Sequence, residues 1–124
     1  MTKPTPPAIA LHVHLDVPET ALTSLLLGME EEGVPAEVTR RDELNPLALA
    51  HAASLESRLG IGVGVALDYA VVTTEKLPEG RPYIAEWLGV SDRIVGSNAA
   101  RIVKRIPLRA TTREGNQHAS LGAD

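Results

Sequence analysis

The sequence contains no cysteine and very few aromatic residues. Its 124 residues include one Trp, two Tyr and no Phe. Without cysteine the chain has no disulfide framework, no thiolate metal site and no cysteine nucleophile. The shortage of aromatic rings argues against nucleic-acid binding by base stacking. Hydrophobic residues make up 44% of the chain and are almost all Leu, Ile, Val and Ala, so we expect an aliphatic core.

The chain also lacks a long apolar run and an excess of positive charge. No segment is apolar for long enough to be a signal peptide or a membrane span, so we expect a cytoplasmic protein without a membrane partner. The net charge of −4 argues against nucleic acid as a partner. The length fits one domain. We expect this domain at 1–109, with an extended lead at 1–7, and a flexible tail at 110–124.

Two kinds of hydrophobic periodicity alternate along the chain. They predict strands at 8–15, 36–40, 60–67, 70–74 and 83–88, and helices at 20–32, 45–58 and 92–105. Asn45 and Pro46 are predicted to be the N-cap and the first residue of the second helix. A hairpin or sharp bend is expected after residue 67. The alternation of predicted strands and helices along the chain predicts a three-layer α/β fold in which helices flank a mainly parallel sheet.

Three glycines, Gly60, Gly62 and Gly64, alternate within the third predicted strand. They do not form a dinucleotide-binding loop, because Leu67 stands where the last glycine of GxGxxG would be. We interpret them as clearing one face of the strand so that a helix or a partner backbone can approach closely.

A possible enzymatic site lies at the end of the first predicted strand. His12, His14 and Asp16 share one face and approach the carboxyl end of the strand, where open α/β sheets bind ligands. They could hold a metal ion in a small metal-dependent α/β enzyme, although no further ligand motif follows. The alternative is that both histidines are structural and partly buried.

An acidic triplet, Glu30 to Glu32, ends the first predicted helix. The apolar residues before it define a buried stripe from which Glu31 points almost directly away. Leu27, one turn earlier, lies near the same outward face with nothing in its own domain to cover it. These residues indicate either a partner interface or a solvated acidic face with one stray leucine.

The last predicted helix is basic on one side. Its apolar stripe is expected to consist of Ile94, Val95, Ala99, Ile102 and Ile106. This leaves an outer face of Arg93, Ser97, Arg101 and Lys104. That face could be solubilising charge, a docking face for an acidic partner or a weak nucleic-acid footprint.

Three segments together resemble a known family. They are LLLGMEEEGVPAEV at 25–38, VVTTEKLP at 71–78 and GSNAARIVKRIPLR at 96–109. In this combination and order they are similar to the small subunit of diol and glycerol dehydratase reactivating factors, over most of the chain from residue 8 to 109. The sequence departs from the family pattern around 62–69 and after Ala110.

The resemblance implies a non-catalytic chain with the fold of the dehydratase medium subunit. Its partner would be a large ATPase subunit, in a heterotetramer of two large and two small chains. By subunit exchange, such a factor releases damaged cobalamin from inactivated diol or glycerol dehydratase. The implied location is the cytoplasm, and association with a bacterial microcompartment stays open. The medium subunit of the dehydratase itself is the nearest alternative.

The resemblance also implies site residues. A glutamate of the family's small subunit helps to bind Mg²⁺ at the interface with the large subunit, and Glu31 matches it, with Glu30 and Glu32 as alternatives if the helix register differs. The GSNAARIVK helix, with Asn98, Arg101 and Lys104, would contact either the large subunit or the dehydratase. An isolated chain is expected to self-associate through the surface around Leu27.

Overall fold

The computed structural model describes residues 6–110. The strands are β1 (Ile9–His14), β2 (Ala36–Arg41), β3 (Ile61–Ala66), β4 (Tyr69–Thr74) and β5 (Ile84–Trp87). A single 3-10 turn, η1 (Glu19–Leu22), precedes α1 (Thr23–Glu31), and the other helices are α2 (Pro46–Glu56) and α3 (Asp92–Lys104). The predicted strands and helices are therefore present, with small shifts at their ends. Apart from residue 110, the tail predicted at 110–124 lies outside the described residues.

The five strands form one mixed sheet in the order β2-β1-β3-β4-β5. Strand β1 is parallel to both of its neighbours, whereas β3–β4 and β4–β5 are antiparallel pairs. The sheet is less parallel than expected because only Leu67 and Asp68 connect β3 to β4. A two-residue turn can join only antiparallel strands.

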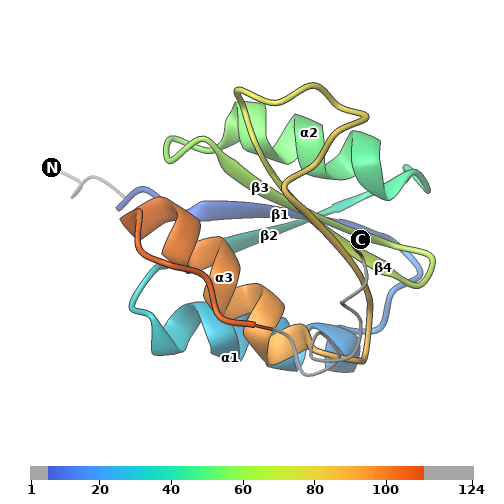
Figure 1. The fold of residues 1–124 in the computed structure, drawn as a ribbon. Coiled ribbons are helices and arrows are strands. Elements are labelled where there is room, and N and C mark those ends of the chain that lie inside the picture. Colours follow the sequence, from blue (N-terminus) through green and yellow to red (C-terminus); the bar gives the residue numbers. More distant parts are fainter. Residues whose placement is uncertain (1–5, 111–124) are drawn as a thin grey trace, which may run out of the picture.

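Helices cover both faces of the sheet, which confirms the three-layer α/β class. Helices α1 and α3 lie together on one face, and α2 lies on the other (Figure 1). The main core lies between the sheet and the α1–α3 pair and includes Ile9, Leu11, Leu25, Met29, Val63, Val65 and Val95. All of these side chains are aliphatic or thioether, as the composition predicts.

Helix α2 packs directly on the glycines of β3. A Cβ added to Gly62 would lie 2.2 Å from the backbone N of Ser54, and one added to Gly64 would lie 2.3 Å from the backbone O of Pro46. The prediction that glycines clear a strand face for a helix is confirmed for Gly62 and Gly64. It is wrong for Gly60, which precedes β3, has a φ of 72° and faces the side chain of Glu75. The side chain of Asn45 caps α2 as predicted, accepting a 2.9 Å hydrogen bond from the backbone N of Leu47.

Within residues 6–110, no helix combines the length and the apolar character that crossing a bilayer requires.

We expect Gly64→Ala to lower the free energy of unfolding by about 2 kcal/mol or more, because α2 must move away from β3 to make room for the methyl group. Urea denaturation at neutral pH measures the change. Gly80→Ala is the matched control, since a Cβ at Gly80 would meet nothing within 4 Å. Equal stability of the two variants would contradict the close contact between α2 and β3.

Candidate functional site

Helices α1 and α3 cross with their backbones in contact. A Cβ added to Gly28 would lie 2.1 Å from the backbone O of Arg93, and one added to Gly96 would lie 2.0 Å from the backbone O of Leu25. The crossing brings the carboxyl end of α1, with its acidic triplet, against the side of α3.

Glu32 is the best-connected member of the triplet. Its carboxylate accepts hydrogen bonds from Ser97 Oγ at 2.7 Å, Arg101 Nε at 2.9 Å and Lys104 Nζ at 2.9 Å. Lys104 Nζ also donates to the backbone O of Glu32, next to the end of α1. Only 12% of the Glu32 side chain is exposed. The hydrogen bonds from Ser97, Lys104 and Arg101, in that order of effect, lower the pKa of Glu32 to about 2.

This network corrects the prediction for α3. Ser97 is fully buried instead of lying on an outer face, and Arg101 and Lys104 turn toward Glu32. A helical wheel with one apolar stripe could not predict this arrangement, because α3 packs against α1 as well as the sheet. The prediction that Ile106 continues the inner stripe is also wrong: α3 ends at Lys104, and Ile106 is 39% exposed.

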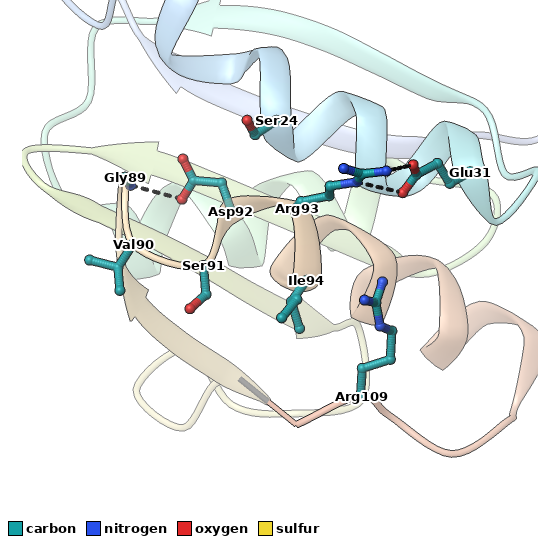
Figure 2. Close-up of a pocket in the computed structure, with 9 residues that line it drawn as sticks. All are labelled: Ser24, Glu31, Gly89, Val90, Ser91, Asp92, Arg93, Ile94 and Arg109. Atoms are coloured by element: carbon teal, nitrogen blue, oxygen red, sulfur yellow. Dashed lines mark hydrogen bonds and ion pairs between the residues drawn. The ribbon is translucent and has the colours of Figure 1, made fainter. Parts of the chain in front are cut away.

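Glu31 lies at the surface, as the helical wheel predicts. There it forms an ion pair with Arg93 of α3. Arg93 Nε donates to one carboxylate oxygen at 2.9 Å, and the Arg93 guanidinium also contacts the other oxygen (Figure 2). The hydrogen bond from Arg93 is the main reason that the pKa of Glu31 is lowered. The Glu31 side chain remains 35% exposed, so it is accessible from outside.

Glu31 and Arg93 border a hollow of about 430 Å³ between α1, the segment before α3 and the returning chain (Figure 2). Arg109 reaches the same hollow because Asn98 holds its backbone. The amide of Asn98 donates to the backbone O of Arg109 at 2.9 Å and accepts from its N at 2.7 Å. Asn98 is itself 4% exposed. In this conformation both ends of its amide are therefore used within the chain, not offered to a partner.

Two neighbouring residues are more open. Leu27 is 39% exposed, so its own domain covers it only in part. Glu30 is also exposed, and its side chain has no hydrogen-bond or ion-pair partner among residues 6–110.

The histidine pair at the end of β1 is buried under α2. His12 is 1% exposed, and its Nε2 lies 2.8 Å from Glu56 Oε1. His14 is 6% exposed, and its Nδ1 accepts a hydrogen bond from the backbone N of Asp16. In the described part of the chain, no three His, Cys, Asp or Glu side chains gather to hold a metal ion. The geometry favours the structural alternative for both histidines.

Comparison with known proteins identifies the family. A family model described as the dehydratase medium subunit matches residues 6–109. The chain belongs to the dehydratase medium subunit family. Together with the relatives and solved structures described next, which are reactivating-factor chains, this match confirms the resemblance seen in the three sequence segments.

Relatives within this family share about a third of their residues with the chain. The propanediol dehydratase-reactivating factor small subunit of Citrobacter freundii is 34% identical over 88 residues, covering 68% of this chain and 76% of that protein. The diol dehydratase-reactivating factor small subunit of Klebsiella michiganensis is 33% identical over 106 residues, covering 83% of this chain and 84% of that protein.

Two solved structures are similar in fold as well as sequence. One is a diol dehydratase-reactivating factor complexed with ADP and Mg²⁺, with a TM-score of 0.79 and 32% identity over 85% of this chain and 99% of that one. The other is a glycerol dehydratase reactivase, with a TM-score of 0.78 and 31% identity over 84% of this chain and 97% of that one.

The Glu32 network predicts a specific acid sensitivity. Because the pKa of Glu32 is about 2 in the folded chain and ordinarily 4.5, its contribution to stability is present above 4.5 and is lost as the pH falls toward 2. Between about pH 5 and pH 3, wild type should therefore lose more free energy of unfolding than Glu32→Gln, as measured by urea denaturation. Glu30→Gln is the control, since it removes a neighbouring carboxylate that has no ion-pair partner among residues 6–110. A wild-type slope in Glu32→Gln would show that the network does not lower this pKa.

Proposed function

We propose that this chain is the non-catalytic small subunit of an ATP-dependent reactivating factor for diol or glycerol dehydratase. The observation that carries the proposal is the nearly complete match to reactivating-factor chains, which reaches 99% of one chain of known structure at 32% identity. The protein acts by binding a large ATPase subunit, in an assembly of two large and two small chains, in the cytoplasm or in a bacterial microcompartment.

The proposed action is subunit exchange. The matching family model is described as the dehydratase medium subunit, and this supports a chain that can occupy the same kind of place as that subunit. Exchange would open a route by which damaged cobalamin leaves the inactivated dehydratase.

We also propose that Glu31 contributes a Mg²⁺ ligand at the interface with the large subunit. Of the three glutamates, Glu32 is engaged by three donors and is largely buried, whereas Glu31 is accessible and is engaged by one arginine. Mg²⁺ prefers carboxylate oxygens and usually keeps several waters, so one carboxylate from this chain fits a shared site. Arg93 would have to yield at least one oxygen of Glu31 to the ion.

The remaining interface residues have unequal support. Leu27 and Glu30 are exposed beside Glu31 and can contact a partner directly. Glu32, Asn98, Arg101 and Lys104 are used within the chain, so we propose that they shape the interface by holding the end of α1 and the segment that carries Arg109.

Co-purification with the large ATPase subunit in Mg²⁺ tests the function and the metal role together. We expect a stable complex that Glu31→Ala or a chelator weakens at least about tenfold, corresponding to about 1.4 kcal/mol. Isothermal titration calorimetry with and without Mg²⁺ measures the loss. Glu30→Ala is the matched control on the same helix and should bind more tightly than Glu31→Ala.

A complex that forms but does not respond to Glu31→Ala would contradict only the metal role. Failure to bind the large ATPase subunit would contradict the proposed function. The second candidate, the medium subunit of the cobalamin-dependent dehydratase itself, is favoured by the description of the family model. It predicts instead a stable complex with the large subunit of the dehydratase.

A further inference from the structure

The carboxyl end of the sheet carries an exposed apolar patch. Strands β1, β2, β3 and β5 all run in one direction, so their carboxyl ends meet at one edge of the sheet. At this edge the chain exposes large apolar side chains, which we call the carboxyl-end patch: Leu15, Leu44, Leu67, Tyr69 and Trp87. Each is between 37% and 58% exposed.

Within the patch, Leu44 lies near Leu67, and Tyr69 lies against Trp87. Leu44, Leu67 and Leu88 line one hollow of about 290 Å³, together with residues that follow β1. The backbone N of Leu88 donates to the backbone O of Asp68 at 2.8 Å, which holds the end of β5 against the β3–β4 turn. The rings of Tyr69 and Trp87 stack with centroids 4.7 Å apart. Figure 1 shows the β3–β4 turn beside the segments that follow β1 and β2.

Leu67 at the tip of the turn has no local structural reason to be leucine. Its φ of 56° lies in the left-handed region, which favours glycine or asparagine. Its side chain is 58% exposed, so it does not compensate by filling the core. A leucine that strains the backbone and does not pack in the core indicates a role in contacts with another molecule.

The surroundings of the patch are acidic. Asp16, Asp42, Glu43 and Asp68 follow the strand ends, and the side chains of Asp16 and Asp42 are 92% and 88% exposed. The basic residues at this edge are Arg40 and Arg41. Arg40 donates to the backbone oxygens of His14 and Val17, and Arg41 lies 3.4 Å from His12 Nδ1. Carboxylates therefore outnumber guanidinium groups around the apolar surface.

We propose that the carboxyl-end patch docks a protein partner whose contact surface has apolar side chains flanked by Lys and Arg. Apolar contact would bury Leu44, Leu67 and Trp87, and the basic flanks would pair with the aspartates. A second copy of this chain does not fit, because a symmetric dimer through the patch would bring two acidic rims together. The patch does not include Glu31, so the proposal is independent of the metal role.

Trp87 is the single tryptophan of the chain, so its fluorescence reports directly on the patch. The probes are two synthetic amphipathic peptides with the same leucine pattern, one carrying lysines and the other glutamates. We expect the lysine peptide to shift the emission of Trp87, with binding that weakens as salt is raised, and the glutamate peptide to leave it unchanged.

Leu67→Asn should weaken binding of the lysine peptide about tenfold and keep the fold, since asparagine accepts a positive φ. Leu44→Ser, in the loop before α2, provides a second test. Leu55→Asn is the control, because Leu55 is 61% exposed on α2 outside the patch.

Three results would overturn the proposal. The first is an equal response to both peptides, and the second is equal binding by the Leu67→Asn, Leu44→Ser and Leu55→Asn variants. The third is a wild-type dimer in sedimentation velocity that Leu67→Asn abolishes, which would make a second copy the occupant.

Discussion

Helices α1 and α3 approach so closely at Gly28 and Gly96 that a methyl group on either residue would collide with the backbone of the other helix. Residues on α1 and α3 that are 62 to 72 positions apart in the chain therefore exchange hydrogen bonds directly. The ion pairs of Glu31 and Glu32 with α3 both depend on this contact. A wider crossing would leave the acidic triplet as three solvated carboxylates.

The crossing gives three adjacent glutamates three different environments. Glu30 projects from the surface and Glu31 is ion-paired with Arg93. Glu32 is largely enclosed by Ser97, Arg101 and Lys104. The division has a physical cause, because α3 lies on one side of the helix end and successive residues of a helix point about 100° apart. Glu31 is the only member of the triplet that is both accessible and held in a defined position, because a single side chain, that of Arg93, pairs with it.

The molecule presents two chemically different surfaces. Around Glu31 most of the groups that line the hollow are polar or charged, although Val90 is exposed in the same hollow and Leu27 lies at its border. At the carboxyl end of the sheet the exposed groups are leucines and stacked aromatic rings surrounded by aspartates. Two surfaces of such different chemistry would select different partners, because charge and apolar area discriminate between partners in different ways.

The order of strands and helices, the aliphatic core, the Asn45 cap, the role of Gly62 and Gly64, and the exposure of Leu27 and Glu31 could all be predicted from the sequence. Each of these follows from periodicity or from local backbone chemistry, and the family followed from three segments in order. The three-dimensional fold was needed to show which residues meet Glu31, Glu32 and Asn98, where Ser97 lies, and that exposed apolar residues near the strand ends gather at one edge of the sheet. These contacts join residues distant in the chain, and hydrophobic periodicity describes the face of one element without specifying which neighbour covers it.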